Sequence, residues 1–209
     1  MNLNVTNKEL KERALTHLNK NWLKAAVATL IAYVILGVPS TYIDIKTDSQ
    51  IGSLLSCLLL PLTYGYYILF LRLKREDKIE FDTLFEGFKE YFPVLFTLLI
   101  MYIFTFLWSL LLIIPGIMKS YSYSMTCFLM ADNPDLRYDA AIERSKKMMH
   151  GHRMQLFLLD LSMIGWFILS ILSLGIGFFF LAPYIQTAHA EFYEELLKEE
   201  ADGVDNSRF

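Results

Sequence analysis

The chain has 209 residues, of which 55% are hydrophobic and 15% aromatic, whereas 20% are charged. Nineteen Lys and Arg residues against 22 Asp and Glu residues give a net charge of −3, which argues against a nucleic-acid-binding protein. The two cysteines, Cys57 and Cys127, stand alone in apolar runs, which argues against a disulfide framework and predicts buried thiols.

Four uncharged segments dominate the chain, over residues 25–43, 51–71, 92–118 and 161–188. A membrane hydrocarbon core of about 30 Å is crossed by about 20 helical residues, so each segment is long enough to cross. We therefore predict an all-α, polytopic membrane protein. The first 21 residues are polar, so we expect no cleavable signal peptide and a first helix that directs its own insertion.

Two apolar stretches are too long for a single crossing. Residues 92–131 carry one charge and would form a helix of about 60 Å, and residues 156–190 carry one charge and would form a helix of about 52 Å. Pro115-Gly116 and Gly175-Ile176-Gly177 punctuate helices strongly, so we place bends there. The prediction is a bundle of six transmembrane helices in three hairpins, with a polar tail over residues 197–209. The predicted helices cover residues 22–38, 51–71, 92–114, 117–131, 156–174 and 177–196.

The basic residues test this count independently. Fifteen of the nineteen lie in residues 1–24, 72–90 and 132–155. Cytoplasmic loops beside membrane helices are enriched in Lys and Arg, and an even number of predicted crossings separates these three segments. We therefore expect all three segments and both termini on the cytoplasmic side of the plasma membrane.

The same arrangement suggests a weak internal repeat. Each basic segment is followed by two apolar helices with Gly or Pro at the bend, which defines units over residues 8–71, 80–131 and 136–196. The pattern repeats without repeating residue identity, and chance similarity between helical hairpins explains it equally well.

The basic segments are predicted to be amphipathic. Thr6 and Glu9 fit a capping box at the start of the first one. In residues 81–92 the aromatic side chains share one helical face and the charges lie elsewhere, which favours an interfacial helix over a partner-binding helix. Residues 138–149 also form an amphipathic helix, which is more typical of a solvated cytoplasmic helix than of a lipid-headgroup site.

A search for catalytic patterns finds no HExxH, no GxSxG and no phosphate-binding loop. His150 and His152 flank Gly151, but two histidines in a basic segment are more typical of a surface than of a metal site. The sequence therefore gives no support for an enzyme, a metal site or a bound cofactor.

Asp160 is the carboxylate that we single out inside a predicted membrane helix. A charge there is costly and usually faces the bundle interior, a partner or water. The favoured interpretation is structural, in which Asp160 reaches water, pairs with Arg153 or accepts a hydrogen bond from a Ser or Tyr of another helix. The alternative is a proton or ion site. The fourth predicted helix adds hydroxyl groups that are more typical of packing than of a cavity lining, at Ser120, Tyr121, Ser122, Tyr123, Ser124 and Thr126.

Short segments near the start of the chain (residues 8–22), in its middle (within 131–152) and near its C-terminus (within 157–193) together resemble a bacterial integral membrane family known as domain of unknown function 975. The resemblance covers most of the chain and is strongest near the C-terminus, although Met163 stands where the family commonly has Phe. It implies a bacterial membrane protein and implies no activity. The residues that carry it are 8–22, 131–134, 141–142, Ser145, Met149, 151–152, 157–162, 164–166, 175–177, 183–184 and 192–193.

The sequence thus favours a non-enzymatic membrane component that binds a protein partner or lipid through its cytoplasmic face. The alternative is a small transporter or channel-like subunit that uses Asp160 and the hydroxyl-rich fourth helix. The expected partners are the lipid bilayer and either a protein partner or further copies of the chain, and no nucleic acid.

Overall fold

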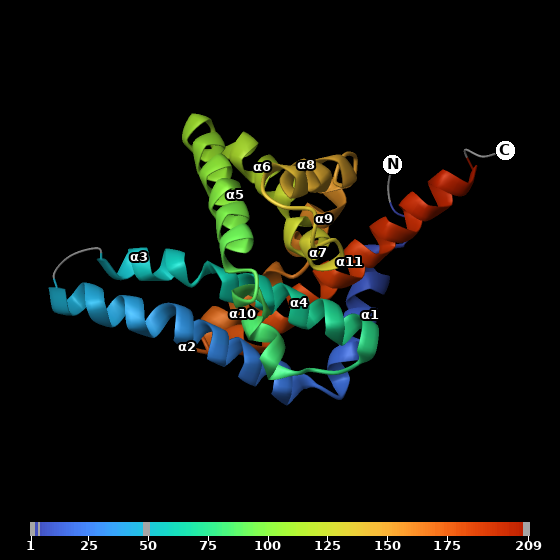
Figure 1. The fold of residues 1–209 in the computed structure, drawn as a ribbon. Coiled ribbons are helices and arrows are strands. Elements are labelled where there is room, and N and C mark those ends of the chain that lie inside the picture. The colour runs from blue at the N-terminus through green and yellow to red at the C-terminus, as the bar shows by residue number, and fades with distance from the viewer. Residues whose placement is uncertain (1–2, 4, 48–50, 207–209) are drawn as a thin grey trace.

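The structure is a computed structural model that describes residues 3, 5–47 and 51–206. These residues form helices and no β-strand, as the sequence predicts. Figure 1 shows the arrangement. The elements are α1 (Asn7–Asn19), α2 (Trp22–Thr47), α3 (Ile51–Leu58), α4 (Leu60–Glu76), the 3-10 helix η1 (Phe81–Phe88), α5 (Tyr91–Leu111), α6 (Ile113–Tyr123), α7 (Thr126–Asp132), α8 (Asp139–Met148), α9 (Arg153–Leu161), α10 (Ile164–Leu172) and α11 (Phe178–Asn206).

The capping box predicted at the start of α1 is confirmed. The Glu9 backbone N–H donates to Thr6 Oγ1 at 3.3 Å, and the Thr6 N–H donates to Glu9 Oε2 at 2.8 Å. These two bonds satisfy N–H groups that the first helical turn leaves without acceptors. The helix then buries Leu10, Ala14 and Leu18, which recur at helical spacing along one face.

Proline sets two helix boundaries that differ from the predicted ones. The predicted helix over residues 51–71 is two helices, because α3 ends at Leu58 and Pro61 lies in the first turn of α4. The bend expected at Pro115-Gly116 lies earlier, at Leu112, whose backbone is extended with φ −159° and ψ 140°. Proline lacks an N–H and is tolerated in the first helical turn, so α4 and α6 start just before their prolines rather than ending at them. The helix predicted over residues 22–38 instead continues through Pro39 as far as Thr47.

The C-terminal third confirms one predicted break and corrects another boundary. The chain turns between α10 and α11 over residues 173–177, where Leu174 (φ 55°) and Gly175 (φ 89°) adopt the left-handed conformation that ends helices. The predicted polar tail from residue 197 is instead helical as far as Asn206, because α11 runs on as a charged helix.

Three helical stretches among the described residues are long and apolar enough to cross a membrane. They are Trp22–Thr47, Tyr91–Leu110 and Arg153–Leu172, the last of which combines α9 and α10. Only 22% of each apolar window is buried inside the protein. Most of this apolar surface is therefore available to lipid, and the chain has the character of a membrane protein.

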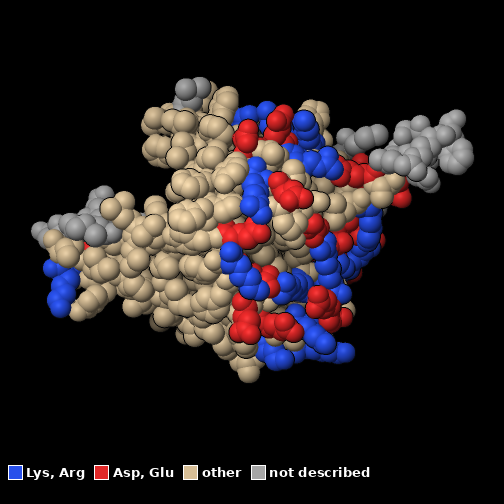
Figure 2. Space-filling model, viewed as in Figure 1, with Lys and Arg blue, Asp and Glu red and all other residues tan. Residues whose placement is uncertain are grey.

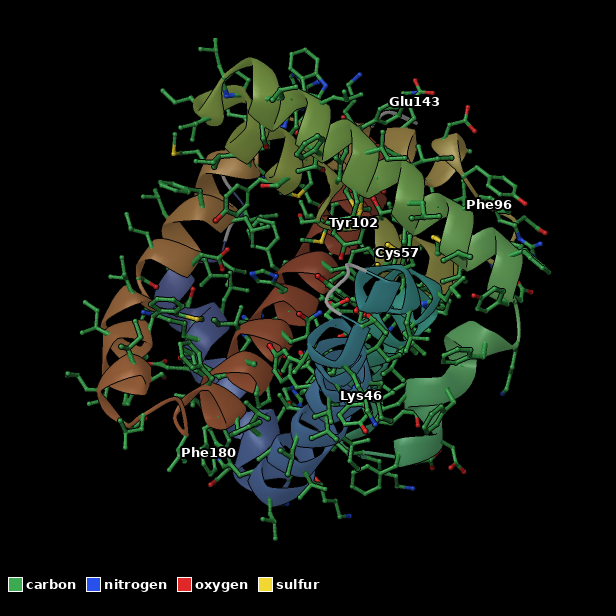
Figure 3. The ribbon with its side chains drawn as sticks, turned by 90° about the vertical axis from the view of Figure 1, so that its left-hand side faces the viewer. Lys46, Cys57, Phe96, Tyr102, Glu143 and Phe180 are labelled. Carbon is green, nitrogen blue, oxygen red and sulfur yellow. The ribbon has the colours of Figure 1, made fainter. Side chains whose placement is uncertain are left out.

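The helices do not pack as one bundle. The α2–α3 pair and the α5–α6 pair leave the centre of the molecule in different directions (Figure 1). Viewed along that apolar side, Phe96 and Tyr102 of α5 and Phe180 of α11 lie apart from one another (Figure 3) and all three are exposed. Cys57 is likewise exposed, so the prediction of a buried thiol holds for Cys127 and is wrong for Cys57.

The buried core lies at the opposite end, where α4 and α11 cross. It includes Phe70, Phe128, Phe192 and Tyr193, each fully buried, and α1, α7 and α9 pack around it. Figure 2 shows Lys, Arg, Asp and Glu gathered over this end, while the surface of the projecting helices is almost free of charge. We call this charged end of the molecule the base.

The aromatic segment after α4 differs from its prediction. It is a 3-10 helix, η1, and it packs on α4 through buried Thr83, Leu84 and Gly87, while Phe81 and Phe85 stay exposed. Gly65 of α4 lies directly against the Leu84 carbonyl, and Gly87 lies directly against the Pro61 carbonyl. Two glycines thus let the backbones of α4 and η1 touch.

Glycine also meets serine where each pair of apolar helices turns back. Gly52 of α3 lies against the Ser40 carbonyl of α2, Gly116 of α6 against Ser109 of α5, and Gly177 against Ser170 of α10. Small residues at such contacts let membrane helices approach closely. This recurrence adds residue identity to the repeated pattern seen in the sequence.

Candidate functional site

Asp160 joins three helices through its carboxylate. Its Oδ1 lies 2.7 Å from Nε2 of His189 on α11, and its Oδ2 accepts a hydrogen bond of 3.0 Å from the Tyr121 hydroxyl on α6. The Asp160 side chain is 26% exposed, so solvent or headgroups reach one edge of it. One carboxylate of α9 is thus held by two neighbouring helices.

Arg153 is not a partner of Asp160. The two residues are seven positions apart on α9, which is about 10 Å along the helix axis. Within the described residues the Asp160 carboxylate is bound instead by Tyr121 and His189, and Arg153 Nε is buried with no hydrogen-bond partner. Of the options raised by the sequence, the structure shows the hydrogen bond from a tyrosine of another helix and partial exposure of the carboxylate, but not the pair with Arg153.

The Asp160 cluster has two chemical capacities. A carboxylate that accepts bonds from a hydroxyl and an imidazole fixes the positions of the helices that carry them. A carboxylate and an imidazole in contact can also share and pass a proton. The two capacities predict different responses to removing the charge.

Asp160→Asn keeps the shape and one acceptor oxygen, so we expect it to retain the wild-type melting temperature in detergent within a few degrees. Asp160→Leu strands the Tyr121 hydroxyl and the His189 ring, so we expect it to lose about 2 kcal/mol of stability. Thermal unfolding of the two purified variants beside the wild type measures this. An Asn variant as unstable as the Leu variant would contradict a purely hydrogen-bonding role.

Glu191 is a second carboxylate of interest, which the sequence did not single out. It lies within the last predicted membrane helix together with Glu194 and Glu195, so the predicted membrane helices contain carboxylates besides Asp160. The Glu191 side chain is 0% exposed and lies 3.0 Å from Lys74 Nζ and 3.2 Å from His17 Nε2. Two features of the sequence could have indicated this ion pair: three glutamates lie near the end of one predicted helix, and Lys74-Arg75 follow the end of another.

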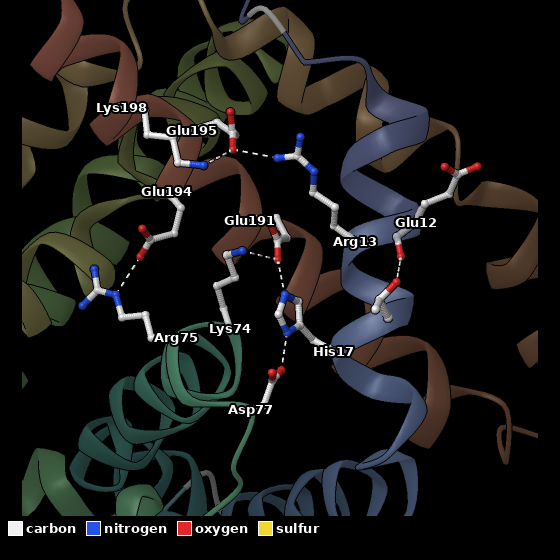
Figure 4. Close-up of polar contacts among 11 residues, drawn as sticks. Glu12, Arg13, His17, Lys74, Arg75, Asp77, Glu191, Glu194, Glu195 and Lys198 are labelled. Atoms are coloured by element: carbon white, nitrogen blue, oxygen red, sulfur yellow. Dashed lines mark hydrogen bonds and ion pairs between the residues drawn. The ribbon is translucent and has the colours of Figure 1, made fainter.

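The same junction continues outward as a network of ion pairs (Figure 4). His17 also contacts Asp77 through Nδ1, so its ring bridges two carboxylates. Arg75 of α4 lies 2.7 Å from Glu194 and binds Asp132 of α7 through both terminal nitrogens. Partly buried charges in such a network hold α1, α4, α7 and α11 in one arrangement.

A crevice of about 440 Å³ opens at the base between α4, η1, α5 and the segment after α7. Three arginines line it, and each is bound to a carboxylate: Arg72 to Glu86 at 2.7 Å, Arg137 to Glu90 at 2.6 Å, and Arg75 to Asp132. The lining is charged but balanced, so it offers no free cation to an anionic ligand.

Histidines give no metal site in the part of the chain that the structure describes. No group of three or more His, Cys, Asp or Glu side chains there is placed to hold a metal ion. His152 was expected at the surface but is buried, with Nε2 3.6 Å from Glu199.

The fold and these polar clusters define an all-helical protein with apolar helices long enough to span a membrane and a salt-bridged base. The family model described as "Protein of unknown function (DUF975)" matches residues 1–119 and 110–200. The chain belongs to this family. No curated protein and no solved structure matches it.

Proposed function

We propose that the protein is a non-enzymatic component of the bacterial cytoplasmic membrane that binds lipid or a protein partner through its cytoplasmic base. The observation that carries this proposal is the separation of the surface into an apolar region on the projecting helices and a charged base (Figure 2). A bilayer has the same two environments, and basic residues beside its core favour the cytoplasmic side.

In this proposal the chain crosses the membrane six times, and the bilayer brings α2–α3 and α5–α6, which point in different directions in the structure (Figure 1), side by side. The three candidate spans of α2, α5 and α9–α10 would each be followed by a return crossing, formed by α3–α4, by α6–α7 and by the first part of α11. The glycine–serine contacts support this arrangement, because they place each return helix against the span that precedes it. Both termini then lie beside the base.

A cysteine-labelling experiment tests the six crossings. Single cysteines replace Lys78, Lys147, Asn2, Asp205 or Asp48 in a chain whose Cys57 and Cys127 are changed to Ser. We expect a membrane-impermeant thiol reagent to label intact cells at position 48 and to reach the other four positions only after lysis. Labelling at 78 or 147 before lysis would overturn the six-crossing arrangement.

The Asp160 cluster favours a second candidate, a small proton-coupled transporter or channel-like subunit. The supporting observation is the contact between Asp160 and His189, which could hold a proton within the membrane region. If this candidate is right, Asp160→Asn should stay folded and lose any gradient-dependent phenotype of a deletion strain. A folded Asn variant that restores the deletion strain fully would favour the binding role.

A further inference from the structure

Three cationic side chains lie in the region where α6 packs against α8 and against α9. Ser145 of α8 donates a hydrogen bond of 2.9 Å to the Ser122 carbonyl of α6, and Lys146 follows it. Tyr121 of α6 makes an edge-to-face contact with Phe157 of α9, with ring centroids 5.8 Å apart. Phe157 lies one helical turn after Arg153, the second cation. The third cation is Lys119 of α6, and the charges of Lys146 and Arg153 both act on it.

These three cations have no carboxylate partner. Within the described residues no Asp or Glu oxygen lies within 4.0 Å of Lys119, Lys146 or Arg153, whereas the arginines of the base are paired. The acids nearest in sequence are engaged elsewhere, since Glu143 pairs with Lys147 at 3.6 Å.

Two of the cations also have an unusual environment. Lys119 Nζ lies 4.6 Å above the Trp108 ring, so an aromatic face replaces an acid as its neighbour. Arg153 Nε is buried and has no hydrogen-bond partner. A buried N–H without an acceptor is costly, and a phosphate that drew the Arg153 side chain outward would supply an acceptor.

The start of α9 adds to the positive charge. Arg153 is the first residue of this helix, and no side chain caps the turn. The free N–H groups and the positive end of the dipole at a helix N-terminus favour anions. Neighbouring His152 adds little charge near neutral pH, because burial lowers its pKa.

The cluster lies beside apolar surface. Met118 of α6, one position before Lys119, is 51% exposed, and Met154 of α9, one position after Arg153, is 64% exposed. Unpaired cations beside exposed apolar side chains match a molecule that carries both a phosphate and hydrocarbon chains.

We propose that Lys119, Lys146 and Arg153 bind the phosphodiester of an anionic phospholipid whose acyl chains lie against α6 and α9. This inference rests on the proposed membrane role and deepens it by naming a ligand and its site. It also revises the interpretation of residues 138–149 as a purely solvated helix, because Lys146 presents its charge to a shared site.

The test compares phospholipid retention by the intact protein. Wild type and the triple variant Lys119→Gln, Lys146→Gln, Arg153→Gln are purified in detergent with equal amounts of phosphatidylglycerol and phosphatidylcholine, and bound lipid is counted by native mass spectrometry. We expect the wild type to retain more phosphatidylglycerol than phosphatidylcholine. In the triple variant the ratio of the two bound lipids should fall about tenfold, since each cation near an anionic headgroup adds to the electrostatic attraction.

A matched control removes the same charge elsewhere. Lys8, Lys89 and Lys147 have highly exposed side chains, and their triple Gln variant should keep the wild-type lipid preference within twofold. If the cluster variant does not fold, the single change Lys146→Glu at an exposed position should lower phosphatidylglycerol retention on its own.

Three outcomes would overturn the site. They are equal loss in the control and cluster variants, equal retention of the two lipids by the wild type, and full displacement of phosphatidylglycerol by millimolar inorganic phosphate, which would indicate a free-phosphate site. A wild type that shows equal retention while its cysteine labelling still fits six crossings would remove this site and leave the membrane role intact.

Discussion

Lys74→Met is expected to destabilise the base by about 3–5 kcal/mol, because it leaves the Glu191 carboxylate buried without its nearest cation. Glu191 is 0% exposed and lies 3.0 Å from Lys74 Nζ. His17 Nε2, at 3.2 Å, is the other neighbour of this carboxylate, and the His17 ring is shared with Asp77. Thermal or denaturant unfolding in a mild detergent, monitored by the helical circular dichroism signal, measures the loss.

A double-mutant cycle separates the stranded charge from lost packing. Glu191→Leu combined with Lys74→Met replaces the pair by apolar groups of similar length, so we expect the double variant to recover most of the lost stability. Lys8→Met, at an exposed and weakly paired lysine, is the control and should change stability by less than about 0.5 kcal/mol. A double variant less stable than Lys74→Met would show that Glu191 has an essential partner besides Lys74.

Gly65→Ala is the second change with a large expected effect. A Cβ at this position would collide with the Leu84 carbonyl oxygen and lie 2.8 Å from the Thr83 carbonyl oxygen, so α4 and η1 would have to separate. Overpacking of this kind costs about 1–3 kcal/mol or more, and we expect the upper part of that range because both obstacles are backbone atoms.

Gly165→Ala is the matched control for this prediction. Gly165 lies in α10 with no atom within 4 Å of an added Cβ. Alanine is favoured over glycine inside helices by about 1 kcal/mol, so this variant should be as stable as the wild type or slightly more stable. The melting temperatures of the two alanine variants in the same detergent test this difference. Similar values would mean that separating η1 from α4 costs no measurable stability.

Local sequence signals predicted much of the fold. The Thr6–Glu9 capping box, the turn at Gly175 and the helical class of the chain depend on neighbouring residues, and the structure confirms them. The break before Pro61 was not predicted, and the bend expected at Pro115-Gly116 lies a few residues earlier, because proline fits a first turn as well as it ends a helix. The six crossings remain a prediction.

The partners of Asp160 and Glu191 could not be predicted from the sequence, because they are distant along the chain. Asp160 stood out because charge is rare in an apolar run, but His189 is 29 positions away and Tyr121 is 39 positions away, so only the fold shows the cluster. Arg153 was proposed as a partner because it is near in sequence, and the helix pitch carries it away from Asp160. The three glutamates of the last predicted helix were visible in the sequence, but the partners of Glu191 were not, since Lys74 and His17 come from two other helices.

The location of the core at one end gives the molecule an uneven local stability. Buried residues such as Phe70 and Phe192 concentrate where α4 and α11 cross, while the far parts of α2 and α5 expose most of their side chains. Regions with few buried contacts open more easily than the core that anchors them. Backbone amide exchange of the protein in detergent should therefore slow from the helix tips toward the base.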